Sequence, residues 1–286
     1  MQRPPAFRPC LRTAGVLWTL VLCVPAPVFS EEANPLLKTF VDEFVAITPG
    51  EGAFPASFRQ GSGAEPSERP VRDVTFARPF QIARYEVPQN LYELVMEQNP
   101  SRWKGPRNSA ERMTWGEAVE FCERATRLLR EAKLIGDDEV IRLPTESEWE
   151  YCCRAGTTTA YSFGDSAQKE GDADARATIL DAYAWHTGNA AGNDPAVGSL
   201  KPNAWGLYDM HGYLWEYCQD EWRADYEGAP TDGRAAADRE AEPKQRVIRG
   251  GSWKDPFAAL RSSSRRPFDV AARDDAVGFR CVRSRQ

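Results

Sequence analysis

The stretch between Tyr161 and Trp222 most restricts the folds open to this chain, because it shows no sustained helical or strand periodicity. Gly, Asn, Asp and Trp punctuate it instead. A loop region of this length within a compact domain is uncommon, and it needs a metal, a disulfide or buried Trp side chains to fix its conformation. The sequence therefore predicts a domain in which ordered loops make up much of the structure.

Regular elements are predicted on both sides of this stretch. Thr114 with Glu117, and Thr145 with Glu148, form two capping boxes that each open a helix. The second of these helices is expected to end at Gly156. The remaining predicted elements are an amphipathic helix within 31–47, a strand pair within 71–87, the strand-like segments RVIRGGSW and VGFRCVR, and a mobile polar excursion over 227–245.

Size and charge exclude several classes of protein. The chain has 286 residues, with 36 basic and 42 acidic side chains and a formal net charge of -6. At roughly 100–200 residues per domain, this is one large domain or two small ones. Such a chain has no overall positive field with which to hold a phosphate backbone, so no nucleic-acid partner is expected.

The first thirty residues have the order of a secretory signal peptide. Arg3, Arg8 and Arg12 precede the apolar run AGVLWTLVLCV, and PAPVFS then supplies small residues for cleavage after Ser30. We therefore expect residues 1–30 to be removed, no membrane span to remain, and the mature protein to be secreted or periplasmic. The alternative, lipidation at Cys23, is disfavoured by the bulky residues before it.

Five cysteines remain after this cleavage, in a compartment where disulfides persist. They are Cys122, Cys152, Cys153, Cys218 and Cys281. Because the number is odd, at least one of them is expected to stay unpaired.

Four motifs occur in an order that is hard to assign to chance: RLPTESEWEYCCRAGTTTAYSFGD, KPNAWGLYDMHGYLWEYCQDEW, RVIRGGSW and DDAVGFRCVR. Together they resemble the formylglycine-generating enzyme family, also called the sulfatase-modifying-factor domain. The resemblance implies a single α+β domain of the C-type-lectin-like kind, with little regular secondary structure and long ordered loops. We expect this domain to span 53–286, preceded by an N-terminal extension over 31–52.

The residues that carry catalysis in this family are not matched. In its active enzymes, two cysteines follow the Gly-Gly-Ser-aromatic turn, hold copper and activate oxygen. Here the first of these positions falls on Asp255 and the second between Phe257 and Leu260, and no cysteine occurs between Cys218 and Cys281. Soft thiolates select Cu(I) and a carboxylate does not, so we expect no catalytic residues of this type and no copper.

Neighbouring cysteines do not offer a substitute. Cys152 and Cys153 are adjacent on a predicted helix, where their side chains point about 100° apart, which disfavours a joint two-sulfur site. By resemblance, Cys122 and Cys281 match a disulfide of the family. Cys153 matches a second one, whose partner position is Ser262 here, and Cys218 is the hypothetical replacement partner.

The segment LYDMHGYLWE resembles a calcium loop of the family. Carried over position by position, the ligands are the Asp209 side chain, the carbonyls of Gly212 and Leu214, and the Glu216 side chain. Oxygen ligands from a tight loop are those that calcium takes, so a structural calcium ion is expected. The alternative is that Asp209 and Glu216 are solvated or cap backbone amides. The family's other calcium loop is not recognisable in HTGNAAGNDPAVG.

The remaining candidate residues are interpreted as structural rather than functional. His186 and His211 are the only histidines, which excludes a multi-histidine metal site. The carboxylates of Glu146, Glu148 and Glu150 are expected in a solvated first helical turn. Seven tryptophans are interpreted as core and loop anchors rather than a sugar-binding platform: Trp103, Trp115, Trp149, Trp205, Trp215, Trp222 and Trp253.

The sequence thus favours a binding or structural module for an unidentified protein or glycan ligand, without formylglycine-generating activity. Two alternatives stay open. One is an enzyme of the same superfamily with divergent oxidative chemistry. The other is authentic oxidation of a protein cysteine, as in sulfatase maturation, through another thiol.

Overall fold

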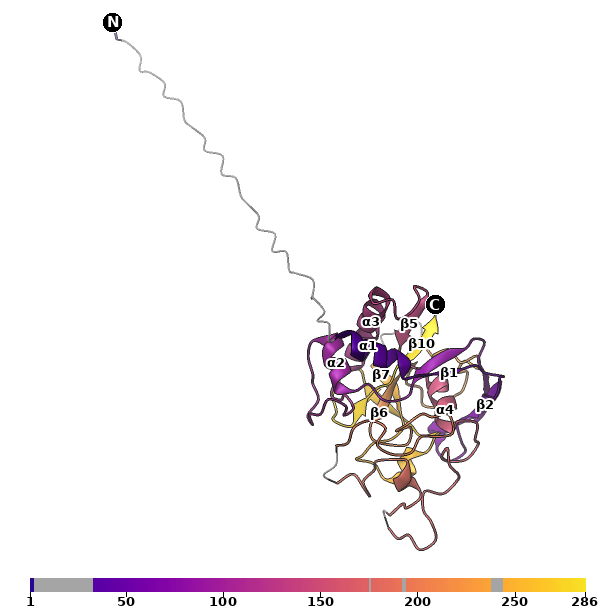
Figure 1. Ribbon diagram of the computed structural model, residues 1–286. Helices are drawn as coiled ribbons and strands as arrows, with labels where there is room; N and C mark the ends of the chain where they lie inside the picture. The colour runs from indigo at the N-terminus through magenta and orange to yellow at the C-terminus, as the bar shows by residue number, and fades with distance from the viewer. Residues whose placement is uncertain (3–32, 175, 192–193, 238–243) are drawn as a thin grey trace.

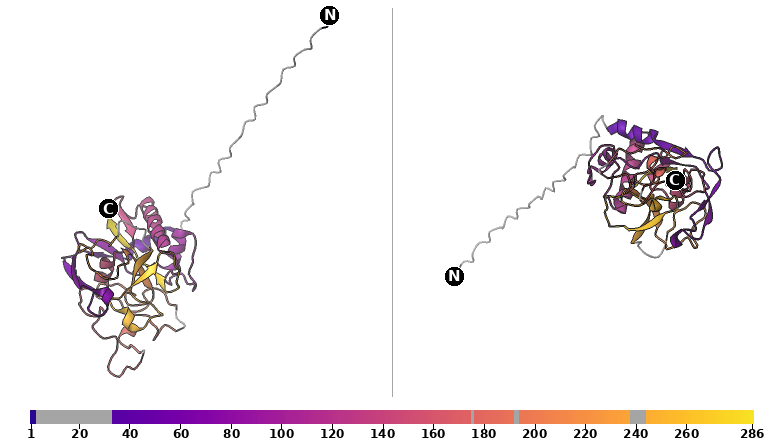
Figure 2. Two further views of the ribbon diagram at one scale, coloured as in Figure 1. Left: turned by 180° about the vertical axis from the view of Figure 1, so that it is seen from behind. Right: turned by 90° about the horizontal axis from the view of Figure 1, so that it is seen from below.

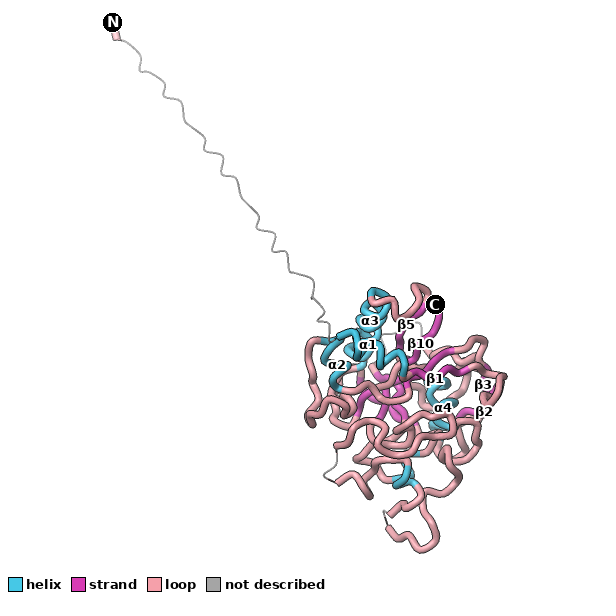
Figure 3. Tube along the Cα trace, viewed as in Figure 1, coloured by secondary structure: helices cyan, strands magenta, loops and turns pink. Residues whose placement is uncertain are grey.

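The computed structural model describes residues 1–2, 33–174, 176–191, 194–237 and 244–286, and loops outweigh helices and strands along this traced chain (Figure 3). The helices are α1 (Ala33–Asp42), α2 (Gln89–Met96), α3 (Trp115–Glu131) and α4 (Glu146–Arg154). The strands are β1 (Phe44–Ile47), β2 (Ser57–Gln60), β3 (Arg72–Thr75), β4 (Phe80–Ala83), β5 (Glu139–Arg142), β6 (Trp215–Glu221), β7 (Gln245–Arg249), β8 (Arg265–Asp269), β9 (Val277–Gly278) and β10 (Val282–Arg285). This is the single α+β domain that the sequence predicts.

One antiparallel sheet joins the two ends of the described domain. Its strand order is β1-β4-β10-β5, so the C-terminal strand lies between β4 and β5. Val282 pairs with Ile82 on one side and with Arg142 on the other. Helix α3 packs against β5, and the C-terminal strand lies at the same end of the molecule as α3 (Figures 1 and 2).

A second sheet, of order β8-β7-β6-β9, carries most of the candidate site. Strands β6 and β9 run parallel, with Trp215 opposite Val277 and Glu216 opposite Gly278. Strand β7 pairs with both β6 and β8 in antiparallel fashion. Trp215 and Glu216 are therefore held in the interior, next to the turn that follows β7.

Both predicted capping boxes are confirmed. The Thr114 hydroxyl accepts the amide of Glu117, and the Glu117 carboxylate accepts the amide of Thr114 at 2.8 Å. The same reciprocal pair joins Thr145 and Glu148 at the start of α4. Helix α4 ends one residue earlier than predicted, because Ala155 rather than Gly156 is its left-handed cap, with φ of 48°.

Two predictions of secondary structure are wrong. The helix expected within 31–47 ends at Asp42, and Phe44–Ile47 is a strand that pairs with β4. The strand pair expected within 71–87 is not a pair, because β3 pairs with β2 while β4 pairs with β1 and β10. In both cases hydrogen bonds to distant segments override the local pattern, as is common for β-structure.

The loop region between Tyr161 and β6 is fixed by aromatic contacts and a small apolar cluster. The rings of Tyr161, Phe163 and Tyr183 stack in succession, and His211 meets the first two edge-on. Trp205 packs edge-on against Tyr151 of α4. These contacts supply the buried aromatic anchoring that a long ordered loop needs.

The polar segment 227–245 is not a free excursion over its described part. The carbonyl of Thr231 accepts the amide of Thr75 at 2.9 Å, and that of Gly233 accepts the Thr145 hydroxyl at 2.9 Å. The prediction of mobility is therefore wrong for residues 229–237, and residues 238–243 lie outside the described part.

The predicted signal segment also lies outside the described part, except for residues 1–2. Within the described ranges, no helix has the length and apolar character needed to span a bilayer.

Candidate functional site

Asp255 lies two residues after Trp253 of the Gly-Gly-Ser-Trp turn that follows β7, and its carboxylate is held by three donors. Its Oδ2 accepts the indole N–H of Trp215 at 2.8 Å and the Ser252 hydroxyl at 2.5 Å. Its Oδ1 forms an ion pair with Arg266 at 2.9 Å. The side chain of Asp255 is therefore positioned and charge-balanced by its neighbours.

The residues after Asp255 form a short 3-10 helix, Phe257–Leu260, and the second family position falls within it. Leu260 is fully buried and fills the space beside two glycines. A Cβ at Gly212 would lie 2.8 Å from the Leu260 side chain, and one at Gly251 would lie 2.7 Å from it. Both glycines have positive φ, so the turn around Leu260 depends on their lack of a side chain.

Cys122 and Cys281 lie side by side beneath the first sheet. Their Sγ atoms are 4.0 Å apart, and both are present as buried thiols. Burial raises the pKa of the Cys281 thiol well above its usual range. The two sulfurs are thus close neighbours inside the core, where the resemblance places a disulfide.

Cys153 lies in a different cluster. Its Sγ contacts the imidazole of His211 at 3.8 Å and the carbonyl of Met210 at 3.5 Å. Burial raises the pKa of the Cys153 thiol to about 12, and the nearby Ser262 hydroxyl opposes that rise. Ser262 is thus next to Cys153, as the resemblance implies, and Cys218 belongs to the same buried cluster as Cys153. Burial also raises the pKa values of Cys152 and Cys218 well above their usual range.

The acidic first turn of α4 is buried, which contradicts the prediction of a solvated turn. Glu146 forms a two-pronged contact with Arg265 at 2.6 and 2.9 Å, and Glu150 pairs with Arg249 at 2.5 Å. Burial would raise the pKa of Glu146, but Arg265 and Arg249 hold it below its usual range. The arginines come from β7 and β8, more than ninety residues away along the chain. No local sequence pattern predicts this pairing.

The predicted calcium loop is also buried. Glu216 pairs with Arg280 through two contacts of 2.6 Å and accepts the indole N–H of Trp149 at 2.8 Å. Asp209 accepts the amide of Gly198 at 2.7 Å. Neither carboxylate is solvated, so the alternative that Asp209 and Glu216 face solvent is wrong. The alternative that they accept backbone amides agrees with the contact between Asp209 and Gly198.

A third carboxylate, missed by the sequence reasoning, completes this cluster. Glu86 is fully buried; its Oε1 accepts the amide of Leu214 at 3.1 Å, and its Oε2 has no hydrogen-bond partner among the described residues. Burial, reinforced by Glu216 and Asp209, raises the pKa of Glu86 well above its usual range. Burial likewise raises the pKa of Asp209 to about 6.

The donor set fits calcium in part. Three carboxylates share one guanidinium, and the unpartnered oxygen of Glu86 is a hard ligand that a cation would satisfy. Against this, both oxygens of Glu216 are already held by Arg280. If calcium binds, Asp209 and Glu86 are the side chains free to hold it, with the loop carbonyls of Gly212 and Leu214.

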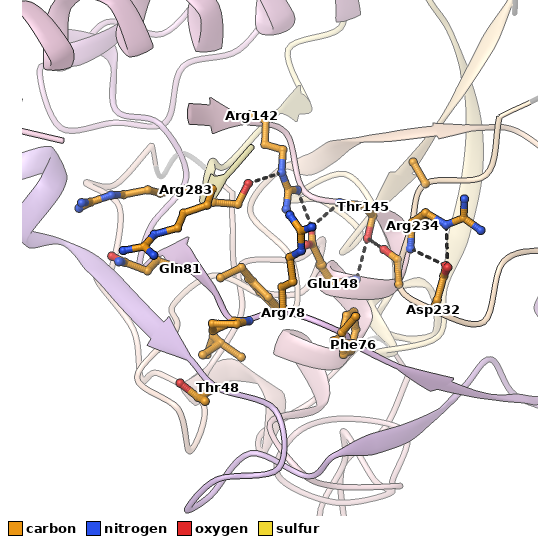
Figure 4. A pocket seen from close by; sticks show the side chains of 18 of the residues that line it. Thr48, Phe76, Arg78, Gln81, Arg142, Thr145, Glu148, Asp232, Arg234 and Arg283 are labelled. Atoms are coloured by element: carbon orange, nitrogen blue, oxygen red, sulfur yellow. Dashed lines mark hydrogen bonds and ion pairs between the residues drawn. The ribbon is translucent and has the colours of Figure 1, made fainter. Parts of the chain in front are cut away.

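A cavity of about 910 Å³ lies beside β4, β5 and β10 (Figure 4). Several arginines line it, and most are paired within it. Arg142 contacts Glu148 twice at 2.7 Å, and Arg283 pairs with Glu139 at 2.6 Å. With the pair of Arg234 and Asp232, these contacts balance most of the lining arginines, so we interpret the cavity as a site of structural ion pairing.

A smaller cavity, of about 210 Å³, lies next to the candidate site. Trp253, two residues before Asp255, forms part of its wall, together with Tyr213 and Trp103. Trp103 is 46% exposed, unlike the buried Trp149, Trp205 and Trp215. The interpretation of the tryptophans as anchors thus holds for those three, while Trp103 lies on the surface. The sequence pattern gave no signal for this cavity.

Comparisons with known proteins agree with this geometry. The chain is 26% identical over 311 aligned residues to chaperone protein LppX of Paenibacillus barcinonensis, covering 94% of this chain and 99% of that protein. It is 24% identical to the formylglycine-generating enzyme of Bos taurus, covering 88% of this chain and 63% of that enzyme. It also spans 21% of the length of serine/threonine-protein kinase pkn1 of Chlamydia pneumoniae, at 32% identity over half of this chain.

Solved structures give the same fold. The structure of PvdO from Pseudomonas aeruginosa superimposes with a TM-score of 0.69 at 29% identity, covering 84% of this chain and 94% of PvdO. Residues 30–285 match the family described as the sulfatase-modifying factor enzyme 1-like domain. This match extends over most of the chain, and the chain therefore belongs to that family.

Proposed function

We propose that this protein is an exported member of the sulfatase-modifying factor family that binds a partner and does not generate formylglycine. The observation that carries the proposal is the environment of Asp255. A carboxylate held by Trp215, Ser252 and Arg266 lies where the first reactive cysteine of the family is expected.

The chemistry of the Asp255 carboxylate favours a structural role over a catalytic one. Formylglycine generation in this family relies on thiolates that hold copper and exchange with the substrate cysteine, and soft metals select sulfur over oxygen ligands. A carboxylate with three donors offers neither function. The second position falls between Phe257 and Leu260, and no side chain in that range has a ligand atom.

The remaining thiols support the same conclusion. The five described cysteines are all buried, and burial raises the pKa values of four of them: Cys152, Cys153, Cys218 and Cys281. The thiolate, not the thiol, is the nucleophile and metal ligand. A second pair of reactive sulfurs is therefore not supported elsewhere in the described chain.

Names of relatives favour two functions. The relative matched over nearly its full length is called a chaperone, which accords with a binding role. A relative called formylglycine-generating enzyme, matched over 88% of this chain, favours the alternative of protein cysteine oxidation. Export is proposed from the signal-like first thirty residues, and a structural calcium ion from the carboxylate cluster around Asp209.

A direct assay separates the two functions. The purified protein is incubated with copper, oxygen and a sulfatase peptide that contains the target cysteine, and the peptide mass is measured. We expect the cysteine to stay unmodified while an active family member run in parallel converts it. Formylglycine in the peptide would overturn the proposal. Copper titration of the same sample should show no thiolate-to-copper charge-transfer band.

A further inference from the structure

The cavity beside Trp253 is lined by two buried polar side chains, Glu111 and Ser109. Glu111 is 4% exposed; its Oε1 accepts the amides of Arg102 and Trp103, while its Oε2 has no hydrogen-bond partner among the described residues. The Ser109 hydroxyl is equally buried and lies beside the Glu86 carboxylate, to which it can donate, so its lone pairs remain available to a ligand. Because buried polar groups are nearly always satisfied, the unpartnered carboxylate oxygen of Glu111 in this cavity indicates a ligand that donates hydrogen bonds.

The charges around the cavity favour a positive ligand. Asp275, which also lines it, is balanced by Arg102 at 2.9 Å and by Lys254. Glu111 has no ion pair in the described part of the chain. No basic residue is among those that line the cavity. The nearby Arg102 and Lys254 are already paired with Asp275, so they leave the Glu111 carboxylate without a counter-charge.

The aromatic walls suit the same chemistry. Arg102 lies 4.7 Å from the ring centre of Trp103, and Lys254 lies 5.2 Å from that of Trp253, so both rings already attract cations on one face. The faces of aromatic rings attract ammonium and guanidinium groups. The volume of about 210 Å³ equals the space of about seven water molecules, which is the size of one long side chain rather than of a larger ligand.

We propose that this cavity binds a protonated amine or guanidinium group, carried by a small molecule or by a Lys or Arg side chain of a peptide. Glu111 and Ser109 accept its N–H groups, and Trp103, Tyr213 and Trp253 flank its alkyl stem. This inference deepens the proposed binding function by naming the chemical class of the ligand, and in that respect it rests on that proposal.

The proposal predicts how the affinity for a cation depends on pH, because Glu111 holds the cation best when it is ionised. Burial raises the pKa of Glu111 to about 7, a rise that the amides of Arg102 and Trp103 oppose and Asp275 reinforces. A bound cation favours the ionised carboxylate, so binding releases a proton and tightens as the pH rises. Burial also raises the pKa of Asp194, which lines the cavity, and this acts in the same direction. The charged groups that face Glu111 from neighbouring segments are Arg102, Arg112, Asp194, Lys254 and Asp275.

The test is a calorimetric titration of the full mature chain with n-butylamine and with 1-butanol, which has the same shape without the charge. We expect butylamine to bind at least tenfold more tightly than butanol, and about tenfold more tightly at pH 8 than at pH 6. Equal binding of the two probes, or no binding of butylamine at pH 8, would overturn the inference.

Variants assign the binding to the cavity. In Glu111→Gln the amide oxygen can still accept the two backbone N–H groups, whereas the side chain loses its charge, so butylamine affinity should fall at least tenfold. Ser109→Ala should weaken binding by a smaller factor and serves as the second variant if Glu111→Gln does not fold. Glu93→Gln, at an exposed site on α2, is the matched control and should bind as the unmodified protein does. Unchanged affinity in the folded cavity variants would contradict the assignment.

A second probe, Nα-acetyl-lysine methylamide, distinguishes a peptide side chain from a small molecule as the source of the cation. Tighter binding than butylamine indicates a peptide side chain, and weaker binding indicates a small molecule; either result keeps the cation site. The formylglycine assay is independent of this titration. Loss of amine binding without peptide oxidation removes only this inference, whereas peptide oxidation with amine binding intact removes only the proposed lack of formylglycine-generating activity.

Discussion

The Sγ atoms of Cys122 and Cys281 lie 4.0 Å apart although the two residues are 159 positions apart in sequence. One comes from α3 and the other from the segment just before β10, so a bond between them would tie the first sheet to the helix that covers it. The first prediction concerns this pair.

Oxidation should join Cys122 to Cys281 in a disulfide. Because the closed loop is long, the bond should stabilise the fold by about 5 kcal/mol through the reduced entropy of the unfolded chain. Thermal unfolding with and without reductant measures the difference, and peptide mass mapping identifies the pair. Cys122→Ser should abolish the effect of reductant; if reductant still lowers the Tm of that variant, another pair is responsible.

Calcium should raise the Tm of protein first treated with chelator. The physical reason is that a cation would balance the excess of carboxylates formed by Glu86, Asp209 and Glu216 around one guanidinium. Asp209→Asn should remove most of the response, since it removes one charged ligand. A Tm that does not change on calcium addition would argue that the Asp209 carboxylate serves only to accept the amide of Gly198.

Without calcium, the stability of the fold should fall as the pH rises toward 6 and beyond. Burial raises the pKa of Asp209 to about 6. Its folded-state pKa is therefore above the ordinary value near 4, so its contribution is full below about pH 4 and is lost as the pH rises through 6. Asp209→Asn can keep the bond to Gly198 and should flatten this slope, gaining on the order of 1–3 kcal/mol relative to the unmodified protein at pH 8. Urea unfolding at pH 5 and 8 tests it; parallel slopes in both proteins would contradict it.

Arg280→Met should be severely destabilising. Arg280 is fully buried and makes both of its short contacts with Glu216, so its removal leaves a buried carboxylate without a counter-charge. The expected loss is about 3–5 kcal/mol in free energy of unfolding. Arg59→Met, at an exposed position of β2, should change stability by less than about 0.5 kcal/mol. Equal effects of the two substitutions would contradict the role of the buried pair.

The parts of the fold that sequence predicts are those specified within a few residues. The two capping boxes need only positions three apart, and both helices begin where Thr114 and Thr145 indicate. The family motifs predict the domain as a whole. The burial of Glu146 could not be predicted, because the arginines that balance its charge are supplied by strands folded against α4 from the far end of the chain.

For the candidate site too, only the features that a local motif specifies could be predicted from the sequence. Sequence identifies Asp255 by its place after the Gly-Gly-Ser turn, which also supplies Ser252 as a donor, but Trp215 and Arg266 come from other strands. Glu86 and Glu111 carry no motif at all. Each became a candidate only because folding buried it with an oxygen left unpaired, and that property belongs to the tertiary structure.

The position of β10 between β4 and β5 has a consequence for biogenesis. Residues 282–285 supply the inner strand, so the first sheet cannot close until translation has reached residue 285. The edges of β4 and β5 that face β10 therefore stay without their partner strand until the last strand of the described domain has been made.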